Sequence, residues 1–457
     1  MISEKFRKNL FRSLGILLGV LYFVLLLVHD AFEVNEFEEM ERIVPDAAAR
    51  IWITVLRALT AGSVMTAIFS CFFSFPSLSA SVRYFSPAVS ALNVAFYRLN
   101  FTCYLGNEYT TGLLAIRIVG FVLENLLIFA ISLLNWLEFV KKGGGKPSAK
   151  SALLTAGFIA FVTVFAAPTT TLMSLNGGIF GYNSREFNLF HVIVLLICVA
   201  LPVVLTLLFR NKPYEIRYFI CCYFSVALLF GFFSRYDFAS YKDLFAQLIR
   251  HEIPDGMDAL PFQLCNLGIV LSGIAYAFKS KTVFYFNFLG NFVGFLMGLL
   301  LPKISGDFFR PTTVHYWQNH IYGILLIILG LSLRIFAKPT KKDLKNALLL
   351  FLGYFVFVMI LDVWFGYDYD QGKGCNFFFL NSSLYADYLH IGLIREAPFV
   401  IRWTDAAGFT YRIYYLYWIV IYVVYSLLMT AVYFGTSLIC KAADKIRFSK
   451  GKKNEEV

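Results

Sequence analysis

The run LFHVIVLLICVALPVVLTLLF, residues 189–209, contains no Asp, Glu, Lys or Arg. The hydrocarbon core of a bilayer takes about 20 helical residues to cross, and a soluble helix seldom offers so many apolar positions in succession. Comparable runs recur along the chain, the clearest being Leu14–Val28, Ala152–Met173, Tyr214–Phe233, Val283–Leu301 and Tyr415–Cys440. The sequence therefore predicts an integral, multi-pass membrane protein.

The composition supports the same class. The chain has 457 residues, of which 59% are hydrophobic and 15% charged, and this favours one polytopic bundle or two fused ones over several soluble domains. The net charge of +11 does not indicate nucleic acid, because the Lys and Arg lie in short blocks at the ends of the apolar runs. That placement is typical of retained cytoplasmic loops. We therefore expect membrane lipids as partners and the cell membrane as the location.

The basic blocks also predict the number of spans. Lys5, Arg7, Lys8 and Arg12 place the N-terminus inside, and the basic linker Lys141–Lys150 should be inside as well. An even number of spans must then precede the linker, so the weaker stretch 84–105 has to cross in addition to three clear runs. With that span, the later basic loops and the basic tail all fall inside. The prediction is an all-α transmembrane helical bundle of about twelve spans with both termini cytoplasmic.

The basic linker is the best candidate boundary between parts. We expect an N-terminal membrane extension of about four spans in residues 1–150, and a fifth span with an outer loop in residues 151–186. Residues 187–457 would form a block of seven spans with a basic tail. The first apolar run resembles a secretory signal, but acidic residues follow it in place of a small-residue cleavage site, so we interpret it as an uncleaved span.

Several polar residues stand at the predicted outer ends of spans in the C-terminal block. They occur in four short stretches and are His191, then Gln263, Cys265 and Asn266 in LPFQLCN, then Asn319 and His320 in HYWQNH, and Asn376 in GCNF. Counted from predicted helix starts at residues 260 and about 315, Cys265 and His320 both lie about 7 Å deep at helical rise. Residues that are unfavourable in lipid usually face a bundle interior or a wet cavity. We expect these side chains to share a polar pocket near the outer face.

Each of these residues also has a purely structural interpretation. A thiol in a membrane helix commonly acts as a small hydrophobe, and a His, Gln or Asn commonly joins two helices by a hydrogen bond. Glu124 also has two interpretations, because it could form an ion pair with Arg117 or belong to a proton pathway. Asp362 lies near an outer helix end and is expected to be hydrated. The sequence shows no metal-ligand spacing and no nucleotide-binding or hydrolase motif, so no metal and no cofactor are expected.

The ordered set of His191, the LPxxLCN stretch, His320 and GCNF resembles the YwaF-like family of bacterial integral membrane proteins, over roughly residues 187–440. Two positions depart from the family pattern, which commonly has His where this chain has Gln263 and often Gly where it has Ile321. The resemblance implies a seven-span bundle. It also implies a distant similarity to an animal membrane family described as phospholipid acyltransferases, which use a membrane Cys and a His.

That resemblance implies specific roles. Cys265 would be the nucleophile that accepts an acyl group, and His320 its base, because the thiolate is the reactive form of a cysteine and an imidazole can generate it. His191 and Asn376 would orient the base or bind the oxyanion, with Gln263, Asn266 and Asn319 as further binding groups. Two other classes stay open on the residues alone. One is a transporter or lipid-binding protein that uses the same polar pocket, and the other is a structural membrane subunit.

Overall fold

The computed structural model describes residues 4–28, 47–98, 111–145, 147–166, 188–233, 238–250, 257, 260–300, 302, 311–368, 373–381, 387, 390–396, 398–404 and 410–445. The chain forms two compact units. The first comprises Met1–Val194, Pro213–Phe238 and Lys303–Asn319, and the second comprises Leu195–Lys212, Ala239–Pro302 and His320–Val457. The predicted division at residues 150 and 187 stays a prediction. The acidic stretch 30–46, which supported the outer position of the first loop, lies outside the described residues.

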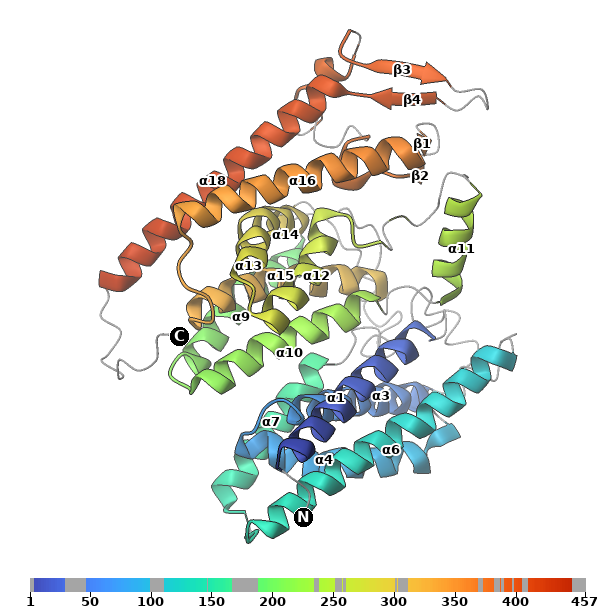
Figure 1. The fold of residues 1–457 in the computed structure, drawn as a ribbon, viewed down its shortest axis with the longest axis vertical. Helices are drawn as coiled ribbons and strands as arrows, with labels where there is room; N and C mark the ends of the chain where they lie inside the picture. Colours follow the sequence, from blue (N-terminus) through green and yellow to red (C-terminus); the bar gives the residue numbers. More distant parts are fainter. Residues whose placement is uncertain are drawn as a thin grey trace. The chain divides into compact units, whose positions relative to one another are not determined.

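Unit 1 is a group of long helices drawn from blue to green in Figure 1. Its helices are α1 (Glu4–Leu27), α3 (Ala47–Ser70), α4 (Pro76–Ala95), α6 (Thr111–Lys141), α7 (Ala149–Ala166) and α10 (Tyr214–Phe233). Within it, α3 packs on α4 and α7, and α6 packs on α1 and α4. The predicted weak span 84–105 corresponds to α4, which begins earlier, with Pro76 at its first helical position, and ends at Ala95.

Small polar side chains join three of these helices. Thr60 Oγ1 on α3 donates to Asn93 Oδ1 on α4 at 3.0 Å. Ser90 Oγ on α4 donates to Asn125 Oδ1 on α6 at 2.8 Å. In lipid there is little hydrophobic drive between helices, so close packing of small residues and interhelical hydrogen bonds hold such contacts together. Glu124, the residue before Asn125 on α6, is 5% exposed, and its ion pair with Arg117 stays a prediction.

Aromatic side chains fasten α10 to the N-terminal helices. The ring of Phe219 makes edge contacts with Phe69 of α3 and Phe75, at centroid distances of 5.3 and 5.1 Å. Tyr223, four residues later, is fully buried and donates its hydroxyl to the carbonyl oxygen of Val162 on α7 at 2.7 Å. Edge-to-face pairs of this kind add to the energy of burial. This helix of the predicted seven-span block therefore belongs to the core of unit 1.

Unit 2 contains most of the remaining helices. They are α9 (Leu189–Phe209, from residue 195), α11 (Phe238–Ile249), α12 (Leu264–Phe278), α13 (Lys281–Phe286), α14 (Phe292–Leu300), α15 (Pro311–Ser332, from residue 320), α16 (Lys341–Phe365) and α18 (Tyr415–Lys445). A π-helical turn, η3 (Asn287–Asn291), links α13 to α14 in one continuous helix. At the start of α16, Thr340 and Asp343 form a reciprocal capping box.

Two short hairpins and two 3₁₀ turns connect α16 to α18. Strands β1 (Tyr367–Asp368) and β2 (Lys373–Gly374) pair antiparallel, as do β3 (Ile401–Thr404) and β4 (Thr410–Ile413). The 3₁₀ turns are η4 (Phe377–Phe379) and η5 (Gly392–Arg395). Figure 1 shows the β3–β4 hairpin at the start of α18. The described part of the chain is thus all-α apart from these small connections.

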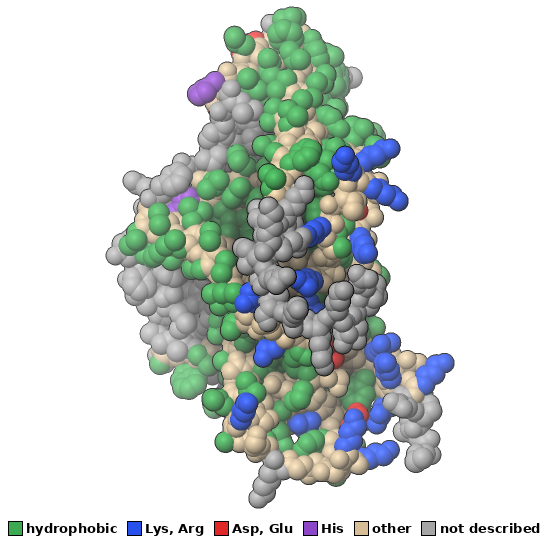
Figure 2. All heavy atoms as spheres, turned by 90° about the vertical axis from the view of Figure 1, so that its left-hand side faces the viewer, with side chains coloured by type: hydrophobic (Ala, Val, Ile, Leu, Met, Phe, Trp, Pro, Cys, Tyr) green, Lys and Arg blue, Asp and Glu red, His purple; other side chains and the backbone are tan. Residues whose placement is uncertain are grey.

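Eight helices of the described part are long and apolar enough to cross a bilayer, namely α1, α6, α7, α9, α10, the α13–α14 helix, α16 and α18. Shorter apolar helices occur within α3 and α12. Large apolar side chains such as Leu153 and Val199 are more than two-thirds exposed, and hydrophobic atoms cover much of the surface in Figure 2. Such a surface suits contact with lipid. The multi-pass character is confirmed, while the total of twelve spans and the cytoplasmic termini remain predictions.

Candidate functional site

Cys265 lies at the very start of α12. The helix begins at Leu264, with Gln263 as its N-cap residue, and Cys265 is therefore its second residue. The thiol is half-buried, and Sγ lies 3.7 Å from Oδ1 of the neighbouring Asn266, which is itself 7% exposed. A polar acceptor beside a partly accessible thiol distinguishes Cys265 from a cysteine enclosed in an apolar core.

His320 lies deeper along its own helix, nine residues after Pro311 at the start of α15. The side chain is 6% exposed. Its ring stands edge-on to Phe295 of α14, with the centroids 6.0 Å apart. On its other side the imidazole rests against Gly298, where an added β-carbon would overlap Nε2. The equal distances from the helix starts, on which the predicted common depth of Cys265 and His320 depended, are therefore not seen.

A single ring brings the helices of both residues together. The tip of Phe295 lies 2.8 Å from where a β-carbon of Gly268 on α12 would stand, and the same ring would overlap a β-carbon on Gly323 of α15. Only glycine permits so close an approach of ring and backbone. Gly268 follows Cys265 by three residues and Gly323 follows His320 by three, so in each helix the glycine and the candidate residue share one face.

The direction of α12 relative to α15 is also defined. The hydroxyl of Tyr276, two turns beyond Gly268, donates to the carbonyl oxygen of Leu326 at 2.6 Å, one turn beyond Gly323. The two helices therefore run parallel where they flank Phe295. In consequence, Cys265 and His320 both lie on the N-terminal side of that ring, each one turn from it.

Gln263 has a different position from the one expected of a pocket residue. Its amide nitrogen donates to the carbonyl oxygen of Asn376, and its amide oxygen accepts from the backbone N–H of Phe378, both at 3.0 Å. The side chain thus pairs with the backbone as a neighbouring strand would. It holds residues 374–381, which we call the knot, against the N-terminus of α12.

The knot has two further anchors of its own. Asn376 Oδ1 accepts from the backbone N–H of Asn381 at 2.9 Å, and Asn381 Nδ2 donates to the carbonyl oxygen of Cys375 at 2.9 Å. Asp362 Oδ1, on the last turn of α16, accepts from the Cys375 thiol at 3.1 Å and from the N–H of Phe377 at 2.8 Å. Asn376 therefore organises the knot, and its expected role beside His320 remains a prediction.

The sequence predicted a hydrated Asp362, and this prediction is wrong. It is 2% exposed, because the knot folds back over the end of α16 and covers the carboxylate. Burial, together with the charge of this carboxylate, raises the pKa of the Cys375 thiol far above its ordinary value. Cys375 is consequently a neutral hydrogen-bond donor and not a nucleophile.

Backbone strain is concentrated in the same segment. Phe378 and Phe379 have φ values of 57° and 55°, in the left-handed region that bulky residues rarely occupy. Each such residue costs of order 1–3 kcal/mol and persists only where the surroundings impose it. The Phe378 ring packs on Phe351 and Tyr425 at centroid distances of 5.8 and 4.8 Å. These contacts and the clamp from Gln263 hold the strained turn.

His191 and Asn319 belong to unit 1. The N–H of His191 is capped by the side chain of Asn188 at 2.9 Å, and its fully buried ring stacks on Trp317 of α15 at 5.5 Å. Asn319 is 4% exposed, and its Oδ1 has no hydrogen-bond partner in the described part of the chain. Both side chains are buried within the described part of the chain. Their placement near Cys265 stays a prediction.

Several residues that pack around Cys265 and His320 could not be predicted from the sequence. Phe295, Gly268, Gly298 and Gly323 sit inside apolar runs and carry no chemical signal of their own. The triplet spacing of Gly268 from Cys265 and of Gly323 from His320 was the available clue. Among the residues that the structure describes, no cluster of three or more His, Cys, Asp or Glu side chains is placed to hold a metal ion.

The comparisons with known proteins identify one family. The model of the TMEM164 family matches residues 179–434, which is more than half of the chain and covers the helices that carry Cys265, His320 and the knot. No curated protein and no solved structure matches this chain. The YwaF-like resemblance is not what the match shows, and it stays an expectation. On the extent of that match, the chain is a multi-pass membrane protein that belongs to the TMEM164 family.

Proposed function

We propose that this protein transfers or hydrolyses lipid acyl groups, with Cys265 as the nucleophile and His320 as its base. The observation that carries the proposal is the close packing of both Gly268 and Gly323 against the tip of the Phe295 ring. It supports a thiol and an imidazole on facing helices at one level of the bundle. A thiolate is the reactive form of cysteine, and a nearby imidazole generates it.

The first half of the reaction is an acyl transfer to sulfur. His320 takes the thiol proton, and the Cys265 thiolate attacks the carbonyl carbon of an acyl ester. The C–S bond forms, the ester C–O bond breaks, and the leaving lipid alcohol takes the proton from the imidazolium. A thioester and a lysolipid or other alcohol result. The amide group of Asn266, 3.7 Å from the sulfur through its oxygen, is suitably placed to turn its N–H₂ toward the developing oxyanion.

The second half returns the enzyme to its starting state. An acceptor hydroxyl gives its proton to His320 and attacks the thioester carbonyl, the new C–O bond forms, and the C–S bond breaks. The imidazolium then protonates the departing thiolate. When the acceptor is a lipid alcohol the protein is an acyltransferase, and when the acceptor is water it is an acyl hydrolase. Both outcomes use the same two residues.

A lipid substrate is consistent with the surroundings. The helices that carry the site belong to a chain with large lipid-compatible surfaces, and exposed apolar residues such as Phe278 of α12 and Leu296 of α14 lie on the same elements. An acyl chain that approaches along such a surface keeps its apolar part out of water. Gln263 is not a second base, because a carboxamide takes up no proton at neutral pH, and here it binds the knot.

The test is to trap the thioester. Purified full-length protein in lipid nanodiscs would be incubated with a phospholipid that carries an alkyne-tagged acyl chain, and the Cys265 peptide would be analysed by mass spectrometry. We expect hydroxylamine-sensitive acylation of Cys265 in the wild type, a lasting oxyester in Cys265→Ser, and strongly reduced acylation in His320→Gln. Cys222→Ala is the matched control, because Cys222 is another half-buried thiol in a membrane helix, and it should acylate normally.

Two results would contradict the proposal. One is wild-type protein that never acquires an acyl group under conditions where a thiol-reactive probe still labels Cys265. The other is equal acylation of Cys265 in the wild type and in His320→Gln. The first result would favour the transporter or lipid-binding alternative, because the Cys265 thiol would then be accessible to a reagent and yet form no thioester.

A further inference from the structure

Three connections of unit 2 carry a dense group of basic residues. The connection after α9 contains Arg210 and Lys212, and the connection between α12 and α13 contains Lys279 and Lys281. The third connection leads from α15 into α16 and contains five more Lys and Arg residues between positions 334 and 345. All of these basic side chains are exposed. We call them together the basic surface.

Hydrogen bonds hold the three connections close to one another. The hydroxyl of Tyr285, one turn into α13, donates to the carbonyl oxygen of Ala337 in the third connection at 2.7 Å, and α13 packs on α16. In the last turn of α9, the hydroxyls of Thr206 and Ser332, the last residue of α15, lie 2.7 Å apart in a hydrogen bond. The cations that the sequence distributes over three loops therefore lie at one end of the folded unit.

The basic surface contains little negative charge to compensate its own. In the stretches 210–212, 279–281 and 333–345, all of which the structure describes, Asp343 is the single acidic residue. Its Oδ2 accepts from the N–H and the hydroxyl of Thr340 at 2.7 and 2.6 Å, within the capping box of α16. Like charges that crowd together repel one another and attract anions. The basic surface therefore favours an anionic partner.

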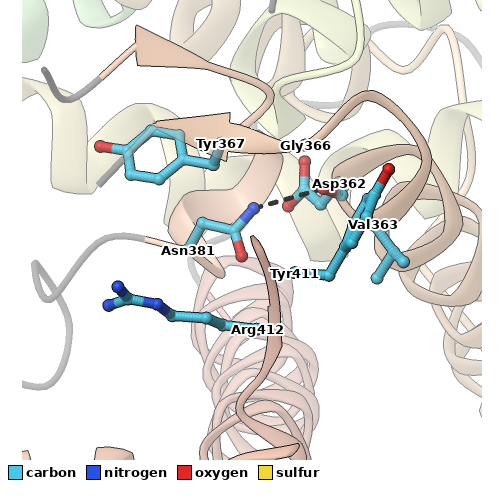
Figure 3. A pocket seen from close by; sticks show the side chains of 7 residues that line it. All are labelled: Asp362, Val363, Gly366, Tyr367, Asn381, Tyr411 and Arg412. Atoms are coloured by element: carbon cyan, nitrogen blue, oxygen red, sulfur yellow. Dashed lines mark hydrogen bonds between the residues drawn. The ribbon is translucent and has the colours of Figure 1, made fainter. Parts of the chain in front are cut away.

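The opposite end of α16 has a different character. There Asp362, Asn381 and Arg412 line a small pocket, in which Asn381 Nδ2 points toward the carbonyl oxygen of Asp362 (Figure 3). An acidic and a basic residue thus line one pocket at that end, whereas the basic surface gathers cations. The difference shows that positive charge is concentrated at a particular end of these helices.

Two of the basic residues occupy backbone positions where glycine is common. Lys279 ends α12 with φ of 49°, and Arg334, two residues beyond the end of α15, has φ of 57°. A side chain with a β-carbon is strained in this left-handed region. The attraction of an exposed cation to the C-terminal end of a helix dipole offsets only part of that strain. Retention of a basic residue at both positions indicates that the charge has a use beyond ending the helix.

Exposed apolar side chains lie directly next to the basic surface. Leu208, Phe278 and Leu349 are each more than half exposed, and each lies within about one helical turn of a basic residue of its own connection. Exposed apolar side chains on membrane helices face the hydrocarbon of the bilayer. The neighbouring cations are therefore at the level of the lipid headgroups, where the phosphate groups of phospholipids lie.

We propose that the basic surface binds the headgroups of anionic phospholipids. Lys and Arg donate charge-assisted hydrogen bonds to phosphate oxygens, and the three connections can surround one headgroup with several donors. Basic residues in single loops are a general feature of membrane proteins. That general feature accounts neither for the convergence of three loops nor for the two strained helix ends.

The inference goes beyond the proposed acyl chemistry and does not depend on it. Cys265 is the second residue of α12, whereas Lys279 follows the last residue of the same helix. The bound lipid would consequently lie at the other end of α12 from the candidate nucleophile. It would act as a bound partner and not as the substrate.

The experiment measures lipid selection by native mass spectrometry. Purified full-length protein in neutral detergent would be mixed with equal amounts of phosphatidylglycerol and phosphatidylcholine that carry the same acyl chains, and the ratio of the two bound lipids would be recorded. We expect the wild type to retain phosphatidylglycerol preferentially. Each basic side chain near an anionic headgroup strengthens the attraction about fivefold, so the double variant Lys341→Gln/Lys342→Gln should lower the ratio by at least about fivefold.

The double variant Lys141→Gln/Lys142→Gln is the matched control. It removes the same charge from two exposed lysines at the end of α6 in unit 1, where Lys142 already pairs with Glu138 at 2.8 Å. Because that carboxylate balances one of the two charges, the ratio of bound lipids should stay within about twofold of the wild type.

Lys279→Gly gives a second and independent readout. The substitution relieves the strained helix end and removes a cation, so the unfolding midpoint in neutral detergent should rise while the ratio of bound lipids falls about fivefold. A purely structural role of Lys279 would leave the ratio unchanged. The opposite directions of the two effects exclude loss of folding as the cause of weaker lipid binding.

Three outcomes would overturn the proposal. The wild type could bind the two lipids equally. The control variant could lose as much selectivity as Lys341→Gln/Lys342→Gln, which would assign the selection to the net charge of the whole chain. Soluble glycerol phosphate could displace the lipid at equal concentration, which would identify a site for free phosphate esters. All of these measurements can be made on Cys265→Ser protein, so their failure is distinguishable from failure of the thioester test.

Discussion

The imidazole of His320 rests directly on the backbone of Gly298, on the adjacent helix α14. A β-carbon at residue 298 would overlap Nε2 of the ring, so glycine at this position is what allows the imidazole to lie between α14 and α15. The nitrogen at issue is a ring atom that has to move a proton in the proposed reaction. A residue with no chemical function thus sets the position of the candidate base.

Gly298→Ala should displace this imidazole. Inserting a methyl group into a packed core typically costs about 1–3 kcal/mol, and a shift of the base by a fraction of an ångström to 1 Å can reduce a rate about a hundredfold. We expect acylation of Cys265 to fall by at least tenfold while the protein still folds. Gly353→Ala on α16 is the control, since a β-carbon there meets nothing within 4 Å. Equal rates in both variants would remove the role assigned to Gly298.

Gln263→Ala should release the knot from α12. The substitution deletes hydrogen bonds to the backbone of Asn376 and Phe378, and leaving such buried groups unpaired costs about 1–3 kcal/mol. We expect a lower unfolding midpoint and faster amide hydrogen exchange at Phe378. Gln263→Glu is informative because it keeps the acceptor for Phe378 but places an oxygen against the Asn376 carbonyl. If Gln263→Glu matched the wild type, the amide donor would have no structural importance.

Lys279→Gly should stabilise the protein. Lys279 ends α12 with φ of 49°, in the left-handed region, where a residue with a β-carbon pays roughly 1–2 kcal/mol and glycine pays none. After allowance for the greater freedom of glycine in the unfolded chain, we expect a gain of up to about 1 kcal/mol. Lys281→Gly, at the first position of α13, is the control and should destabilise. Denaturant titration in detergent measures both, and a loss of stability in Lys279→Gly would contradict the argument.

Because the Cys375 thiol is buried, we expect the folded protein to lose stability at alkaline pH. An unfolded thiol ionises near pH 9, whereas burial and the Asp362 charge raise the pKa of Cys375 in the folded chain. Below pH 9 both states are neutral and the thiol makes no pH-dependent difference. As pH rises further, the unfolded chain releases a proton that the folded chain retains, so the stability of the fold decreases.

This prediction is checked by unfolding midpoints measured between pH 7 and pH 10.5. The decrease above pH 9 should be smaller in Cys375→Ala, although that variant starts from a lower midpoint because its contact with Asp362 is lost. A maleimide probe at pH 7.5 should label Cys265 and leave Cys375 unlabelled in the folded protein. Rapid labelling of Cys375 under those conditions would show that the knot does not bury it.

Much of the fold followed from local sequence. A helix satisfies its own backbone hydrogen bonds, so an apolar run near 20 residues long is sufficient to predict a membrane helix wherever it occurs. The runs at 189–209 and 214–233 correspond to α9 and α10 with the same bounds. The predicted start of α12 at residue 260 was too early, because LPFQ at residues 260–263 is apolar in part but has a proline at its second position and ends in Gln263, whose side chain binds the knot.

The candidate site shows where local reasoning stops. The sequence by itself determined that the chain is a multi-pass helical protein and that Cys265 stands near the start of a helix, because length, charge and hydropathy act one segment at a time. Only the tertiary structure decided that Asp362 is buried, that Gln263 serves the knot, and that Phe295 lies between Gly268 and Gly323. The physical reason is that which face of a helix meets which neighbour depends on the packing of residues far apart in sequence, and an apolar run records no such preference.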